Sequence, residues 1–152
     1  MPKYIFQPKE IDKRQEAQEY IDILGDGFSR DEIDLVLGLL SKAFAKRDVY
    51  DIVMGDQIVG CVEVQTKSEG AVELGIEILE SYQRQGHGYC ALIEMMRRLC
   101  ETKAVSRFEY IVQKTNAASI ALVEKLGGAL VEEKELAGEV LCTYHIQPNK
   151  GA

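Results

Sequence analysis

Long apolar runs are absent from this sequence of 152 residues. Charged side chains recur between Lys3 and Arg14, so the beginning of the chain lacks the apolar stretch of a secretory leader. No later segment is apolar over the roughly 20 residues that a membrane-spanning helix needs. We therefore expect a cytoplasmic protein that does not associate with a membrane.

Positive charge is also scarce. The chain has 18 lysines and arginines against 25 aspartates and glutamates, which gives a net charge of −7. An acidic surface repels the phosphate backbone of a nucleic acid, so we expect no nucleic-acid partner. The same charge attracts a cationic substrate such as a protonated amine, although salt screens this attraction beyond about 8 Å.

Cysteines are few and scattered, and they lie inside apolar patterns. They are Cys61, Cys90, Cys100 and Cys142. No pair shows the C-x-x-C spacing that is typical of a zinc site. We therefore expect four buried free thiols and no metal.

The bulk composition, by contrast, is that of a folded globular protein. Apolar residues make up 46% of the chain and charged residues 28%. A chain of this length buries roughly 68–70% of its unfolded surface, which is enough for a core of its own. No repeat, linker or low-complexity segment divides it, and we expect one domain over residues 1–152.

Periodicity and turn signals divide the chain into strands and helices. Strands are predicted at residues 3–8, 50–54, 58–66, 71–79, 108–112, 129–133 and 140–146, and helices at 12–24, 29–44, 88–102 and 117–126. A two-residue turn at Gly55-Asp56 joins the second and third strands, while Asn116 caps the last helix and Gly127 ends it. The order β-α-α-β-β-β-α-β-α-β-β indicates an α/β (α+β) fold, a mixed sheet with helices on its faces.

The second helix begins with a capping box formed by Ser29 and Glu32. Its apolar residues recur at helical spacing on one face: Ile33, Val36, Leu39, Leu40, Ala43 and Phe44. We expect this face to pack against the core and to take no part in catalysis.

The strand at residues 71–79 separates its apolar side chains from its acidic ones. Val72, Leu74, Ile76 and Ile78 point to one side, and Glu73, Gly75 and Glu77 point to the other. One face of this strand is therefore apolar, and the opposite face has two carboxylates.

The segment Gln83–Gly88 lies between a predicted strand and a predicted helix and contains two glycines. A helix N-terminus offers unpaired backbone N–H groups and a partial positive charge, and glycines let the chain approach an anion closely. This pattern favours a site for a pyrophosphate. A tight turn that needs glycine only for its dihedral angles is the other interpretation.

Two other phosphate-binding motifs are compared with this segment. Gly86-x-Gly88-x-x-Ala91 fits a dinucleotide fingerprint, which requires a ribose-binding acid at the end of the next strand. The nearest acid, Glu109, is predicted near the middle of its strand, and too little chain follows for a dinucleotide fold. A Walker loop requires Gly-Lys-Ser/Thr, which does not follow the glycines.

The chain resembles the GNAT superfamily of N-acetyltransferases at two places. Gln83–Gly88 matches the family pattern Gln/Arg-x-x-Gly-x-Gly/Ala, and Asn116-x-x-Ser119-x-x-x-Glu124-Lys125-Leu126-Gly127 is similar to the segment that lines the pantetheine arm of the coenzyme. The resemblance implies a central, mostly antiparallel sheet and acetyl-CoA as the acyl donor. It implies these coenzyme-binding residues: Ile78, Leu79, Gln83, Arg84, Gln85, Gly86, His87, Gly88, Tyr89, Asn116, Ser119 and Lys125. For Asn116 a cap role coexists with this one, and for Arg84 and Lys125 a solvated surface charge is the other interpretation.

The resemblance also implies direct attack of an amine on the thioester, assisted by a base on the fourth strand. Glu73 matches that place best and Glu77 is the alternative. Many relatives have a tyrosine that protonates the departing sulfur, but Val123 stands at its position here, and Gly128 stands where phenylalanine is usual. Tyr144 is the candidate substitute, with packing in the core as the other interpretation.

The two histidines are not assigned to catalysis. His87 occupies a variable position of the loop and is expected to be exposed, and His145 is expected at the surface near a strand end.

Three functions follow from these observations. The first is an acetyl-CoA-dependent N-acetyltransferase acting on an amine of a small molecule or a protein. The second is a coenzyme-binding regulatory module of the same fold with weak catalysis, and the third is a nucleotide or dinucleotide binder. Because dimers are common in the superfamily, the resemblance also allows a homodimer.

Overall fold

The computed structural model describes residues 3–10, 15, 18–19, 22, 29–44 and 47–148, without the side chains of 40–44. The strands are β1 (Ile5–Lys9), β2 (Arg47–Met54), β3 (Gln57–Thr66), β4 (Ala71–Ile78), β5 (Arg107–Gln113), β6 (Ala129–Leu136) and β7 (Glu139–Ile146), and the long helices are α2 (Arg30–Phe44), α3 (His87–Thr102) and α4 (Ala117–Lys125). Single turns of 3₁₀ helix occupy Ser68–Gly70 and Glu80–Tyr82. This order agrees with the predicted one, except that most of the predicted helix at 12–24 lies outside the described residues.

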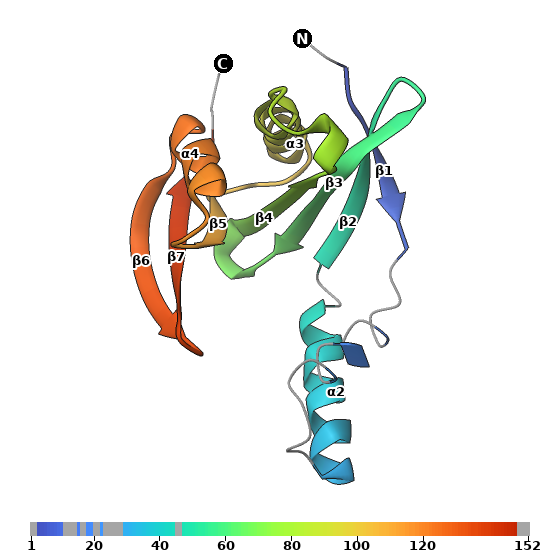
Figure 1. Cartoon of the computed structure of the whole chain (residues 1–152), viewed down its shortest axis with the longest axis vertical. Coiled ribbons are helices and arrows are strands. Elements are labelled where there is room, and N and C mark those ends of the chain that lie inside the picture. The colour runs from blue at the N-terminus through green and yellow to red at the C-terminus, as the bar shows by residue number, and fades with distance from the viewer. Residues whose placement is uncertain are drawn as a thin grey trace.

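The strands form one mixed sheet of seven, in the order β1-β2-β3-β4-β5-β7-β6 (Figure 1). Every neighbouring pair is antiparallel apart from β4 and β5, which run parallel. A parallel connection needs a crossover, and α3 supplies it between these two strands. The sheet is therefore mostly antiparallel, with a single parallel pair near its middle.

Local signals in the sequence explain where several elements begin and end. Gly55, with φ of 66°, and Asp56 form the two-residue turn between β2 and β3, as predicted. The Asn116 side chain accepts a hydrogen bond of 3.1 Å from the Ser119 backbone N–H, which confirms it as the cap of α4. Gly127, with φ of 85°, ends that helix and donates to the Glu124 carbonyl.

The hydrophobic core lies between one face of the sheet and helices α3 and α4. The predicted apolar side of β4 belongs to it, since Val72 and Leu74 are each only 2% exposed. From α3, Leu92, Met95 and Leu99 pack against the sheet. The opposite face of β4 presents the carboxylates of Glu73 and Glu77, so the predicted alternation of this strand is confirmed.

Helix α2 differs from its prediction. Its cap is present, because the Glu32 backbone N–H donates to Ser29 Oγ at 3.3 Å. However, α2 lies below β2, away from α3 and α4 (Figure 1), and Leu39 is 60% exposed. The prediction of a core-facing helix is therefore wrong for Leu39, because amphipathic spacing defines an apolar face but not the surface it meets.

The four cysteines are free thiols, as expected, but only Cys142 is fully buried. Cys61, Cys90 and Cys100 are partly accessible, so the prediction of burial is wrong for them. None of the helices within the described ranges is long and apolar enough to cross a membrane.

Candidate active site

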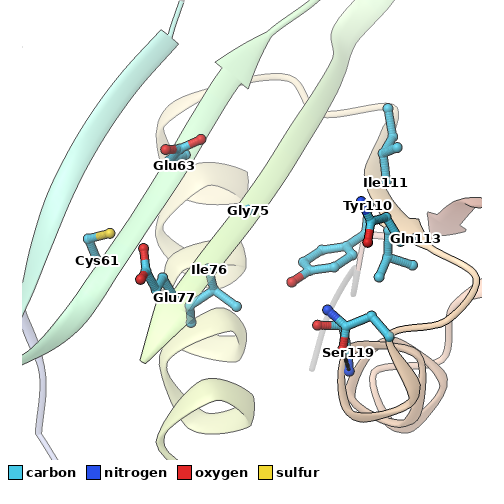
Figure 2. Close-up of a pocket in the computed structure, with 11 residues that line it drawn as sticks. Cys61, Glu63, Gly75, Ile76, Glu77, Tyr110, Ile111, Gln113 and Ser119 are labelled. Carbon is cyan, nitrogen blue, oxygen red and sulfur yellow. Dashed lines mark hydrogen bonds between the residues drawn. The ribbon is translucent and has the colours of Figure 1, made fainter. Parts of the chain in front are cut away.

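The parallel strands β4 and β5 separate partway along their length. Their register pairs Ala71 with Arg107 and ends with Leu74 opposite Tyr110, although β4 continues to Ile78 and β5 to Gln113. A cavity of about 340 Å³ lies where the two strands diverge. We call it the wedge cavity; Figure 2 shows it with the Tyr110 phenol extending from β5 toward β4.

A second cavity, of about 660 Å³, extends from the wedge cavity along the segment between β4 and α3. We call it the loop cavity. Residues from β4, from the loop, from the first turn of α3 and from α4 line it. The two cavities share four lining residues, which are Ile76, Glu77, Asn116 and Ser119. The site is thus one continuous depression with a junction between two chambers.

The loop that precedes α3 is built to present its backbone. Gly86 caps the helix with φ of 83°, a left-handed conformation that favours glycine, and the space beside its Cα is open. Arg84 also has a positive φ, of 64°. No acidic residue lies in the first turn of α3. The first turn of α3 therefore lines the loop cavity with no acidic residue of its own and no side-chain cap, which suits a helix N-terminus that binds an anion.

Two glutamines hold this loop in shape. Gln83 Nε2 donates to the Ile78 carbonyl at 2.9 Å, and Gln85 Nε2 donates to the Ser81 carbonyl at 3.3 Å. Their side chains stabilise the bend. Both glutamine amides are thus engaged in hydrogen bonds with backbone carbonyls of the preceding segment.

Most residues of the predicted coenzyme set line the loop cavity. They are Ile78, Gln83, Arg84, Gly86, His87, Gly88, Tyr89, Asn116, Ser119 and Lys125. Leu79 and Gln85 do not line it. Lys125 Nζ lies 4.2 Å from the centroid of the Tyr89 ring, a cation–π contact between α4 and α3.

His87 is not exposed, which corrects the prediction from sequence. It is 6% exposed, and the Tyr4 hydroxyl lies 2.8 Å from its Nδ1. The rings of Tyr4 and Tyr82 meet it edge-on. The contact between His87 and Tyr4 therefore connects the start of α3 to the segment just before β1, 83 residues earlier in the chain.

The two candidate bases on β4 have different surroundings. Glu77 lines both cavities at their junction. Glu73 lines neither, because its carboxylate forms an ion pair of 2.8 Å with Lys67 Nζ at the paired end of the strands. Geometry thus favours Glu77, the second choice from sequence, over Glu73.

The surroundings of Glu109, the acid considered for a dinucleotide ribose, do not suit a ligand-binding residue either. It is 8% exposed, lines neither cavity and pairs with Lys67 and Arg107 at 3.0 and 3.1 Å. Nothing in its setting fits the ribose contact of a dinucleotide fold.

Tyr144 lies in the hydrophobic core, is 6% exposed and lines neither cavity. Its cross-strand neighbour Tyr110 lines the wedge cavity instead. The sequence analysis did not identify Tyr110, because Tyr110 lies on the same face of β5 as Phe108 and Val112 and has the spacing of an ordinary core residue. The one sequence signal for Tyr110 was its polar hydroxyl on an otherwise apolar face of the strand.

These residues together form a site with two connected chambers. The loop cavity offers backbone N–H groups to an anion, the junction holds a carboxylate, and the wedge cavity is open on the acidic face of the sheet. Among the described residues, no group of three His, Cys, Asp or Glu side chains is placed to hold a metal ion.

Comparison with known proteins gives the family. Solved structures with the same fold include a GNAT-family acetyltransferase from Streptococcus pneumoniae (17% identity, TM-score 0.63, covering 97% of this chain and 100% of that one). They also include the spermidine/spermine N-acetyltransferase SpeG from Vibrio cholerae (14%, 0.65, 96% and 95%) and RimL, a ribosomal L7/L12 alpha-N-protein acetyltransferase in complex with coenzyme A (14%, 0.66, 95% and 93%). No curated protein matches the chain. The family model of the acetyltransferase (GNAT) domain matches residues 3–129, and the chain therefore belongs to the GNAT acetyltransferase family.

Proposed function

We propose that this protein transfers an acetyl group from acetyl-CoA to an amine, with the coenzyme in the loop cavity and the amine in the wedge cavity. The observation that carries this proposal is the junction of the two cavities at Ile76, Glu77, Asn116 and Ser119. A donor and an acceptor that occupy one chamber each meet there. Holding two reactants in this way supplies much of the rate enhancement of an acyl transfer.

The loop fits the pyrophosphate of a coenzyme. The amides around Gly86 and the first turn of α3 point at the anion, and Arg84 and Lys125 add positive charge at the edge of the cavity. The openness beside Gly86 leaves room for a phosphate oxygen. Gly88 lies 3.5 Å, measured from an ideal Cβ, from the Leu122 side chain, so α4 packs closely against the start of α3.

Glu77 is the proposed base. A lysine-type amine has a pKa near 10.4 and must lose a proton before it attacks at neutral pH. The Glu77 carboxylate lines the junction, and an adjacent carboxylate can take that proton directly or through a water molecule. No other carboxylate among the described residues lines both cavities.

The acceptor is proposed to be a cationic amine. Glu63 and Glu77 both line the wedge cavity and attract an ammonium group. Arg47 Nη1 lies 3.6 Å from the Glu63 carboxylate and offsets part of its charge, so Glu77 makes the larger contribution. SpeG acetylates spermidine and spermine, and RimL acts on the N-terminus of a ribosomal protein. Both a small polyamine and a protein α-amine are therefore acceptors to test for this chain.

The test has two stages. Isothermal titration with acetyl-CoA, coenzyme A and NAD should show binding of the first two only. Release of the free thiol is then followed with spermidine, a lysine peptide and peptides with a free N-terminus. Binding without transfer to any amine would leave a regulatory module, and preference for NAD would favour the dinucleotide binder.

A further inference from the structure

Tyr110 lies at the point where the two strands of the wedge part. It is the last residue of β5 that pairs with β4, opposite Leu74, and its side chain crosses the gap toward β4 (Figure 2). It is 5% exposed. The backbone of Ile76 and the side chain of Ser119 lie close enough to the hydroxyl to affect its pKa.

Ile76 and Ser119 both line both cavities, and Tyr110 lines the wedge cavity. The Tyr110 hydroxyl thus lies next to the junction between the coenzyme chamber and the amine chamber, between β4 on one side and α4 on the other (Figure 2). If the donor and the acceptor occupy those chambers, the reacting thioester must lie beside this hydroxyl.

The phenol keeps its proton at neutral pH. Burial raises the pKa of Tyr110 above its ordinary value of 10, although the nearby polar groups of Ser119 and the Ile76 backbone oppose that effect. The titratable groups of the same cavity are Glu77 on β4 and Glu63 and Cys61 on β3, while α4 contributes only the neutral Asn116 and Ser119. Tyr110 is therefore a proton donor among carboxylates.

The usual source of that proton in the family is missing here. Val123 stands at the usual tyrosine position and is fully buried with no proton to give. Tyr82 and Tyr89 line the loop cavity only. Within the described part of the chain, Tyr110 is the single phenol that lines the wedge cavity.

We propose that Tyr110 is the general acid that protonates the coenzyme sulfur as it leaves, which rests on the proposed acetyltransferase function. The amine nitrogen forms a bond to the acetyl carbon, the carbon–sulfur bond breaks, and its electron pair goes to sulfur. Sulfur takes the Tyr110 proton and leaves as a thiol. The proton that the acylated nitrogen loses then returns the tyrosinate to its neutral form.

The first test compares Tyr110→Phe with Tyr50→Phe, a tyrosine that packs against the core from β2 and lines neither cavity. The loss of a general acid should lower kcat for Tyr110→Phe by roughly 100-fold, the low end of the usual range because a thiolate leaves readily. The KM for acetyl-CoA should stay within about threefold of wild type, and Tyr50→Phe should keep its rate.

A kcat equal to that of Tyr50→Phe would overturn the role of Tyr110 while leaving the acetyltransferase function intact. A higher KM at unchanged kcat would also overturn it, because it would reduce Tyr110 to a spacer between β4 and α4. A wild-type protein that binds coenzyme A but releases none with any amine would instead overturn both proposals.

A second variant covers the case in which Tyr110→Phe does not fold. Genetically encoded 3,5-difluorotyrosine keeps the hydroxyl at position 110 and lowers its pKa. If Tyr110 must be protonated, the fall of kcat at high pH should begin at a lower pH than in wild type. The same replacement at Tyr50 should leave the pH profile in place, and an unmoved profile at position 110 would contradict the proposal.

Discussion

The two halves of the β4–β5 pair differ although the same two strands build both. The closed half, Ala71–Leu74 with Arg107–Tyr110, is hydrogen-bonded in register. In the open half, Gly75–Ile78 with Ile111–Gln113, the strands separate and the wedge cavity takes the place of the ladder. Ion pairs between side chains stabilise the closed half, whereas in the open half backbone and a few polar side chains line the wedge cavity.

In the closed half, Glu73 and Glu109 lie directly opposite each other on the sheet. Like charges in that arrangement repel, but Lys67 Nζ bridges them at 2.8 and 3.0 Å. Arg107 and His145 add contacts with Glu109 at 3.1 and 3.5 Å. The cluster therefore fixes the strands at the point from which they diverge.

The ionisation of this cluster follows from its contacts. Burial opposes the charge on Glu109, but hydrogen bonds and attraction from Lys67 and Arg107 outweigh it, so the pKa of Glu109 is lowered. Burial likewise opposes the charge on Lys67, and its bonds to Glu73 and Glu109 outweigh that effect and raise the pKa of Lys67. A carboxylate on β4 thus stabilises the fold before the divergence, whereas after it the Glu77 carboxylate lines the two cavities, which is why we propose it as the base.

The largest effect is expected when the carboxylate of the open half is removed. Glu77→Gln should lower kcat for acetyl transfer by roughly 10²- to 10³-fold, because the attacking amine loses its base. Glu73→Gln removes the same group from the closed half and should change kcat by less than about threefold. Steady-state kinetics over pH 6–9 compares the two, and a larger loss for Glu73→Gln would reverse the assignment.

The second prediction concerns the close approach of β3 to the open half of β4. A Cβ at Gly60 would lie 2.2 Å from the Glu77 carbonyl oxygen and 3.0 Å from Ile78 Cα, both backbone atoms. Gly60→Ala should therefore lower the free energy of unfolding by about 1–3 kcal/mol and weaken coenzyme binding by shifting β4. Denaturant unfolding measures the first effect and titration with coenzyme A the second.

Gly38 is the matched control for that change. It lies within α2, and an ideal Cβ there meets nothing within 4 Å. Since alanine favours a helix over glycine by about 1 kcal/mol, Gly38→Ala should leave stability unchanged or higher. If Gly60→Ala unfolded at the same denaturant concentration as wild type, the packing of β3 on β4 would be looser than the structure indicates.

The third prediction tests the charges of the closed half. Lys67→Met leaves two facing carboxylates without their shared cation and should lower the free energy of unfolding at pH 7 by about 1–2 kcal/mol. Lys67→Arg should recover most of it. Lys103→Met is the charge-matched control, because the Lys103 ammonium makes an exposed hydrogen bond to Thr66 rather than a contact with a carboxylate.

The pH dependence of that loss follows from the two pKa shifts. Glu109, with its pKa lowered by folding, stabilises the protein above its unfolded pKa of about 4.3, and this contribution disappears as the pH falls. Lys67, with a raised pKa, stabilises below about 10.4 and loses its effect above it. Thermal unfolding at a series of pH values should show Lys67→Met and wild type converging below about pH 4; a constant gap would contradict the ion cluster.

Local signals predicted most of the fold and the location of the loop cavity. The glycines of Gln83–Gly88, the cap at Asn116 and the alternation of β4 each act through neighbouring residues, so a sequence pattern reveals them. The loop cavity could be placed from these signals alone, because a helix N-terminus after a strand has the same geometry wherever it occurs.

The remaining features depend on contacts between distant segments. Alternation makes Glu73 and Glu77 equivalent, and only the end of the register opposite Tyr110 distinguishes them. His87 is buried because Tyr4 reaches it from 83 residues away. Tyr110 has the spacing of a core residue, and its side chain lines a cavity only because the strands part beside it.

The smallest effect is expected from a charge in the loop between the open half and α3, because backbone amides rather than side chains are proposed to hold the phosphates there. Arg84→Ala should weaken coenzyme A binding by only about 3- to 10-fold, and less at high salt, since the guanidinium lies at the edge of the cavity. Arg84 has φ of 64°, a conformation that costs a residue with a side chain roughly 1 kcal/mol and glycine almost nothing. Arg84→Gly should therefore bind like Arg84→Ala but unfold at a higher temperature. Titration calorimetry and thermal unfolding separate these effects, and a loss of binding beyond about 100-fold in both variants would show that the side chain, not the main chain, holds the anion.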